Sequence, residues 1–176
     1  MSTAATARMA AAVAGVLRAG RTLREVADAD GPGLTALIEA AYDEYACGPL
    51  DPDGFDDDLA APARSARGSG RSWWVVIDRG LVVASVAHGP LHGSAVELHR
   101  LYLAPAMRGS GLATALVTAV ADEARRIGAR TLDAWSDTRL VAAHARYLAL
   151  GFTLTGAQRE LHDPAGTTEV HFSLPL

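Results

Sequence analysis

Six residues, Arg108 to Ala113, form the segment of this chain whose chemistry is easiest to read. They stand between an apolar segment predicted to be a strand, Leu98–Leu103, and an Ala/Leu/Val-rich segment predicted to be a helix, Leu112–Ile127. A glycine-rich turn that opens a helix directs unpaired backbone N–H groups and the positive end of the helix dipole towards one point. This arrangement suits a phosphate group, so the sequence predicts a phosphorylated cofactor.

The exact form of the glycine motif narrows the choice of cofactor. A nucleoside-triphosphate loop needs Lys and then Ser or Thr after its last Gly, whereas Leu112 and Ala113 follow Gly111. A dinucleotide-binding loop needs Gly or Ala where this chain has Thr114, and an acidic residue about twenty positions later within a βαβ unit. The sequence offers no such unit, and both classes of nucleotide site are disfavoured.

Two motifs resemble the GNAT acyltransferase superfamily. Arg108-x-x-Gly111-x-Ala113 is similar to the family's acetyl-CoA pyrophosphate loop, Arg/Gln-x-x-Gly-x-Gly/Ala. The stretch Tyr147–Phe152 is similar to the Tyr-x-x-Leu-Gly-Phe ending of the family's last helix. The resemblance covers about residues 21–176, and it implies an acetyl-CoA-dependent N-acetyltransferase that transfers the acetyl group directly to an amine.

The resemblance also implies a set of cofactor contacts. The backbones of Leu101 and Leu103 would bind the pantetheine arm in the manner of an added strand. The pyrophosphate would be surrounded by Arg108, Gly109, Ser110, Gly111, Leu112 and Ala113. One position departs from the family, because Leu140 stands where many members have Asn, and Asp137 and Thr138 are the candidates to replace it.

Glu97 is the first candidate for a general base. It lies eleven residues before Arg108, and strict alternation along the strand would place it on one face with His99, Leu101 and Leu103. The resemblance implies that Glu97 accepts the amine proton, usually through water; the alternative is a Glu on the solvated face of a strand. His99 is the second candidate, because imidazole titrates near neutral pH.

Tyr147 is the candidate general acid. The resemblance implies that its hydroxyl protonates the sulfur of departing CoA. An unperturbed Tyr has a pKa of about 10 and is therefore a proton donor at neutral pH. The alternative is an aromatic residue that only packs the helix on the sheet.

The acceptor side is less defined by the sequence. Five aspartates crowd one segment after the first predicted helix: Asp51, Asp53, Asp56, Asp57 and Asp58. Such carboxylates could attract a cationic amine, or could simply belong to a solvated loop. We expect the acceptor to be a primary amine of a small molecule or a peptide. No metal site is expected, since neither the aspartates nor the six His residues have metal-ligand spacing.

Composition fits one soluble globular unit. The chain has 176 residues, a net charge of −4 and a pI near 5.8, and its 16 basic residues are scattered, so neither nucleic acid nor a membrane is an expected partner. The single Cys47 cannot close an intrachain disulfide and fits a reducing compartment, which favours the cytoplasm. The oligomeric state is left open, a homodimer included.

The predicted elements must position these groups. Residues 1–20 are Ala-rich and are expected to form a tail or a short extra helix, whereas residues 21–176 are expected to form a single GNAT-like acetyltransferase domain. The order strand, helices, three strands, helix, strand, helix, two strands predicts an α+β fold. We expect a mixed, mostly antiparallel sheet of six or seven strands with helices on both faces, and a flexible link over Arg64–Gly70. The functional alternative is a non-catalytic CoA-binding regulatory module.

Overall fold

Seven strands form one mixed sheet in a computed structural model that describes residues 3–176. The strand order is β1-β2-β3-β4-β5-β7-β6, and among the described strands β4 and β5 form the one parallel pair. The strands are β1 (Arg21–Glu25), β2 (Ser72–Asp78), β3 (Leu81–His88), β4 (Ala95–Leu103), β5 (Thr131–Asp137), β6 (Thr153–Glu160) and β7 (Thr168–Pro175). The α-helices are α1 (Thr3–Val13), α2 (Gly31–Tyr45), α3 (Pro62–Gly68), α4 (Leu112–Arg126) and α5 (Val141–Ala149). The predicted α+β architecture is confirmed.

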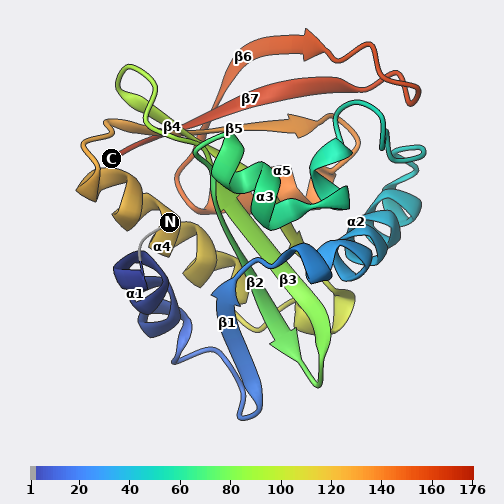
Figure 1. Cartoon of the computed structure of the whole chain (residues 1–176). Helices are drawn as coiled ribbons and strands as arrows, with labels where there is room; N and C mark the ends of the chain where they lie inside the picture. Colours follow the sequence, from blue (N-terminus) through green and yellow to red (C-terminus); the bar gives the residue numbers. More distant parts are fainter. Residues whose placement is uncertain (1–2) are drawn as a thin grey trace.

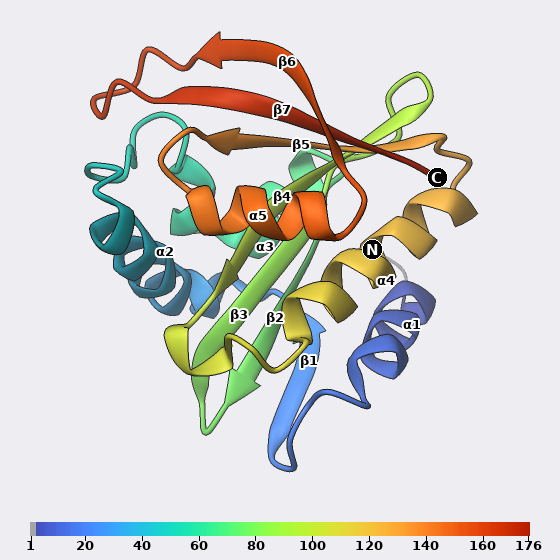
Figure 2. The same cartoon turned by 180° about the vertical axis from the view of Figure 1, so that it is seen from behind.

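Helices cover both faces of the sheet, because successive strand residues point to opposite sides. Trp74 faces the hydrophobic cluster beneath α1 and α4, whereas its neighbour Trp73 faces the cluster beneath α2, which contains Leu34 and Ile38. Figure 1 shows α2 and α3 in front of the sheet, and Figure 2, from behind, shows α4 and α5 on the opposite face.

The N-terminal segment forms helix α1, which lies beside α4 (Figure 1). Ala5, Met9 and Val13 recur every four residues and are buried in the same cluster as α4. Arg8 donates to both carboxylate oxygens of Glu123 on α4 at 2.8–3.0 Å. Of the two alternatives for this segment, the structure contains the helix.

The flexible link expected over Arg64–Gly70 is wrong, because most of that segment belongs to helix α3. Pro62 begins the helix, where its missing N–H costs nothing. Ala63 and Ala66 are buried against the cluster beneath α2. The segment is rich in Ser, Gly and Arg, a composition that does not predict a helix, and tertiary packing stabilises the helix instead.

A β-bulge interrupts β4 at its centre. Ser85 pairs with Tyr102 and Ala87 pairs with His99, so two β4 residues, Arg100 and Leu101, oppose one residue of β3. Arg100 has a φ of 50°, in the left-handed region that a non-glycine residue rarely adopts.

The bulge changes which face each side chain occupies. Before it, Val96 and Leu98 pack beneath α4, so Glu97 and His99 point to the opposite face. After it, Leu101 and Leu103 pack beneath α4. The expected shared face for Glu97, His99, Leu101 and Leu103 is therefore wrong, because the extra residue reverses the alternation.

The parallel strands β4 and β5 pair over only four positions, from Ala95 with Thr131 to Leu98 with Ala134. Beyond these residues the two strands diverge (Figure 2). Among the described strands, none is hydrogen-bonded to the β5 side of the diverging half of β4, at the start of which the bulge lies. Two cavities open around this half of the strand.

Candidate active site

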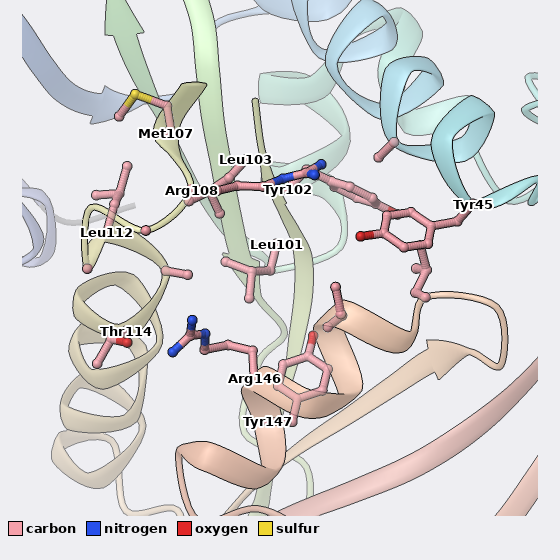
Figure 3. Close-up of a pocket in the computed structure, with 17 residues that line it drawn as sticks. Tyr45, Leu101, Tyr102, Leu103, Met107, Arg108, Leu112, Thr114, Arg146 and Tyr147 are labelled. Carbon is pink, nitrogen blue, oxygen red and sulfur yellow. The ribbon is translucent and has the colours of Figure 1, made fainter. Parts of the chain in front are cut away.

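The first cavity is a groove between β4, the glycine-rich turn Arg108–Gly111 (the glycine loop), and the helices α2, α4 and α5 (Figure 3). The second lies on the other side of β4, beneath α3 and the aspartate-rich segment Asp51–Asp58, here called the acidic segment. Residues of β5 and β7 form its base. Both cavities are lined by Leu101, Tyr102, Leu140, Ala143 and Tyr147. Two molecules, one bound in each cavity, would therefore meet at the bulge.

The glycine loop has the backbone shape that an anion cradle requires. Gly109 and Gly111 have φ values of 71° and 82°, which glycine adopts without a steric cost. Gly111 directly precedes the first residue of α4, so the positive end of that helix opens on the groove. The hydroxyl of Ser110 donates to the Met107 carbonyl at 2.6 Å and accepts from the Leu112 N–H at 3.3 Å, which fixes the turn.

The groove contains most of the predicted cofactor residues. Its lining includes Leu101, Leu103, Arg108, Gly109, Gly111, Leu112 and Ala113. Ser110 does not line it, and its side chain holds the loop instead. The guanidinium of Arg108 forms a bidentate ion pair with the carboxylate of Glu44 on α2, and both N–O distances are 2.7 Å. A second cation of the groove, Arg146, stands directly before Tyr147 and was not identified from the sequence.

Glu97 lies in the second cavity with its side chain one-third exposed. Its carboxylate has no hydrogen bond to any described residue. The nearest nitrogens are Nδ1 of His99 at 3.5 Å and the cationic Nη2 of Arg159 at 3.8 Å. Burial raises the pKa of the Glu97 carboxyl, although the charges of Arg159 and Arg71 oppose that rise. A carboxylate with a raised pKa and free lone pairs is a better proton acceptor than an ordinary Glu.

His99 has the opposite environment. Burial, together with the positive charges of Arg71, Arg100 and Arg159, lowers the pKa of His99 to about 3. Its imidazole is therefore neutral at physiological pH and holds a proton poorly. Between the two candidate bases, this electrostatic difference favours Glu97.

Tyr147 lies where the two cavities meet. Its ring is 6% exposed and packs on Phe152 and Phe172 at centroid distances of 5.2 and 5.3 Å. Its hydroxyl points into the cavity (Figure 3). Burial raises the pKa of Tyr147, so the phenol stays protonated at neutral pH. Packing and proton donation are compatible for this residue, because the ring performs one and the hydroxyl the other.

The acidic segment contributes less free negative charge than its sequence suggests. Asp56 and Asp58 are buried and receive hydrogen bonds from Arg100 at 2.7 and 2.6 Å. Arg71 adds a further bond to Asp58 at 2.8 Å. These two carboxylates therefore neutralise the partly buried Arg71 and Arg100. Asp57 is the exposed carboxylate of the segment that lines the cavity.

Asp137 and Thr138, the candidates to replace the family's Asn, both make hydrogen bonds within the described chain. The carboxylate of Asp137 lines the second cavity but is occupied by Arg139, at 2.7–3.0 Å. The backbone N–H of Thr138 donates to the Thr168 carbonyl. Leu140 itself presents an apolar surface to both cavities.

Comparison with known proteins identifies the fold and the family together. Residues 34–152, more than half of the chain, match the Acetyltransferase (GNAT) family. The chain belongs to the GNAT acetyltransferase family. It is therefore an acyltransferase.

Individual relatives agree with this assignment. The chain is 31% identical over 136 residues to the uncharacterized N-acetyltransferase YjgM of Escherichia coli K12, covering 74% of this chain and 80% of that protein. A structure of yncA, a putative acetyltransferase from Salmonella typhimurium with its cofactor acetyl-CoA, superposes with a TM-score of 0.64 at 25% identity, covering 89% and 94% of the two chains. An acetyltransferase from Streptococcus agalactiae shares the fold, with a TM-score of 0.74 at 16% identity and coverage of 90% and 100%.

Two kinds of feature are absent from the described part of this acetyltransferase. Over residues 3–176, no three His, Cys, Asp or Glu side chains are grouped so that they could hold a metal ion. Within the same residues, every helix is too short or too polar to cross a membrane.

The partly buried environment of Glu97 predicts a raised pKa that can be measured. In a carbon-detected NMR titration, the pKa of Glu97 should lie above the ordinary value of about 4.3, because burial disfavours its charged form. Arg159→Gln should raise this pKa further, because it removes a nearby positive charge. Arg125→Gln, which removes a surface pair with Asp122 on α4, is the matched control and should leave it unchanged. A pKa that falls or stays constant in Arg159→Gln would contradict the assignment.

Proposed function

We propose that this acetyltransferase moves an acetyl group from acetyl-CoA to a primary amine of a small molecule or a peptide, without a covalent enzyme intermediate. The observation that carries the proposal is the meeting of two cavities at Leu101 and Tyr147, one with a glycine loop at a helix N-terminus and one with the partly buried carboxylate of Glu97. Acetyl-CoA in the related Salmonella protein supports the choice of cofactor.

The groove fits the cofactor in two parts. The N–H groups of the loop around Gly109 and Gly111, with the first turn of α4, would hold the pyrophosphate. No described strand pairs with the backbone of Leu101 and Leu103 on the β5 side, so the amides of the pantetheine arm can pair with it as an added strand. The apolar surface of Leu140, Ala142 and Ala143 excludes water from the same arm.

Acyl transfer also requires a proton acceptor for the amine. The protonated amine cannot attack, so Glu97 removes one proton, directly or through a water molecule, and the free amine then attacks the thioester carbonyl. The raised pKa of Glu97 brings the carboxylate closer to the pKa of its substrate, which favours this transfer. His99, with its pKa lowered to about 3, is too weak a base for the role.

Charge then develops on the carbonyl oxygen and the sulfur. The bulge takes Arg100 and Leu101 out of regular one-to-one pairing with β3 at the place where the cavities meet, so their backbone N–H groups are our candidates to stabilise the charge on that oxygen. The C–S bond breaks as Tyr147 donates its phenolic proton to the departing sulfur. The nitrogen loses its second proton to solvent as the tetrahedral intermediate collapses, so the acetylated amine and CoA are the products. Solvent then reprotonates Tyr147, and Glu97 releases its proton to solvent.

The proposal is tested by incubating the protein with acetyl-CoA and a panel of primary amines: amino acids, polyamines, amino sugars and short peptides. Amine-dependent release of free thiol, with acetylated product identified by mass spectrometry, is expected. Glu97→Gln should lower that rate most at a pH above the raised pKa of Glu97 and below the pKa of the amine, where the carboxylate is charged and the amine still needs a base. Acetyl-CoA binding with no thiol release for any amine would favour the non-catalytic CoA-binding module.

Acetyl-CoA should also raise the melting temperature of the protein, and Gly109→Ala should reduce this rise. No heavy atom of the described residues lies within 4 Å of a Cβ built at Gly109, so the substitution itself costs only the positive φ, about 1–2 kcal/mol. Gly128→Ala is the matched control, because Gly128 also has a positive φ, 92°, and open space, but follows the far end of α4. An equal ligand-induced rise in both variants would remove the loop from the cofactor site.

Tyr147→Phe should lower kcat about ten- to a thousandfold with little change in acetyl-CoA affinity, because it keeps the packed ring and removes the proton. The control is Tyr45→Phe, which removes another phenol from the same groove (Figure 3). Wild-type kcat in Tyr147→Phe, in an assay limited by chemistry, would show that Tyr147 only packs.

A further inference from the structure

The cofactor groove contains positive charge and no negative charge. Its described lining residues include two arginines, Arg108 and Arg146, and no Asp or Glu. This is notable in a chain with a net charge of −4. An anion is the ligand that such a groove favours, and the two arginines differ in whether they are free to bind it.

Arg108 is already engaged. Both of its terminal nitrogens donate to the two carboxylate oxygens of Glu44, and these hydrogen bonds raise the pKa of Arg108. The pair joins the glycine loop to the last turn of α2. In Figure 3 the guanidinium of Arg108 points towards Tyr45 and away from Thr114 in the first turn of α4. An anion bound to Arg108 would have to compete with Glu44.

Arg146 is in the opposite situation. It is exposed, and its guanidinium has no hydrogen bond or ion pair to another residue of the described chain, although its backbone carbonyl accepts from the Leu150 N–H. It lies one helical turn after Ala142, and the small side chains of Ala142 and Ala143 leave the groove open in front of it. Figure 3 shows its guanidinium reaching across the groove towards Thr114.

We propose that Arg146 is the side chain that binds the cofactor pyrophosphate, opposite the glycine loop, in place of the loop's own Arg108. The inference rests on the proposed use of acetyl-CoA. Arg146 on α5 and the positive end of α4 face one another across the groove, with no carboxylate between them. A pyrophosphate in that gap is bound by backbone N–H groups on one side and by a planar guanidinium on the other.

The choice of arginine suits this position. The guanidinium presents paired N–H donors that match two phosphate oxygens, whereas a Lys ammonium acts as a point charge. Because Arg146 directly precedes Tyr147, a pyrophosphate bound there also fixes the distance from the phosphates to the proposed acid. Arg146 is thus a binding and positioning residue and takes no part in the transfer itself.

The test compares acetyl-CoA binding by the unchanged protein, Arg146→Met, Arg146→Lys and Arg108→Met, using calorimetry. Arg146→Met should weaken acetyl-CoA binding about ten- to a hundredfold, the range expected for charge-assisted hydrogen bonds. Arg146→Lys should recover part of this loss, and Arg108→Met should lose less than Arg146→Met. Acetyl-pantetheine, which has no phosphate, should bind the unchanged protein and Arg146→Met equally in an NMR chemical-shift titration, which reaches millimolar affinities.

A second ligand shows whether Arg146 binds the pyrophosphate or the 3′-phosphate. Acetyl-dephospho-CoA keeps the pyrophosphate but lacks the 3′-phosphate, so Arg146→Met should weaken its binding as strongly as that of acetyl-CoA. The assignment is overturned if Arg146→Met weakens binding only of the ligand that carries the 3′-phosphate, or if it weakens binding of acetyl-pantetheine equally. A larger loss of acetyl-CoA affinity in Arg108→Met than in Arg146→Met would also overturn it. If the unchanged protein binds no acetyl-CoA, the proposed function itself fails; normal binding by Arg146→Met would refute only the role of Arg146.

Discussion

The buried ion pairs of Arg100 are the interaction on which the rest of the site depends. A left-handed backbone at a non-glycine residue costs about 1–2 kcal/mol, and here Arg100 offsets it by donating to Asp56, Asp58 and the Phe55 carbonyl. Burial disfavours the charge of Arg100, yet Asp58 and Asp56 raise its pKa, so the cation is retained. The bulge held in this way places Leu101 on the cofactor side of β4.

Burial also separates the two candidate bases. Glu97 and His99 lie two residues apart on the same face, and desolvation moves both towards the neutral form. For a carboxyl this strengthens the base, whereas for an imidazole it weakens it. The nearby charges of Arg71 and Arg159 lower the pKa of both groups: they limit the rise at Glu97 and add to the fall at His99.

The glycine loop is supported from behind by the N-terminal helix. Trp74 donates to the Thr6 hydroxyl of α1 at 3.1 Å, and Arg8 joins the same helix to Glu123. After α1, the side chain of Val16 lies 3.5 Å from the point where a Cβ at Gly111 would stand. The loop is therefore held by packing on one side and is open to the groove on the other, so its N–H groups are fixed before any ligand binds.

The sequence by itself determined the local features: the turn at Gly111, the motif at Tyr147, the order of the elements and the α+β class, because backbone conformation and periodicity depend on neighbouring residues. Only the tertiary structure decided the direction of β4 side chains beyond Arg100, since alternation gives no sign of an inserted residue. It also decided that Arg108 pairs with Glu44, 64 positions away. A charge is free or neutralised according to what folds against it, and sequence spacing does not carry that information.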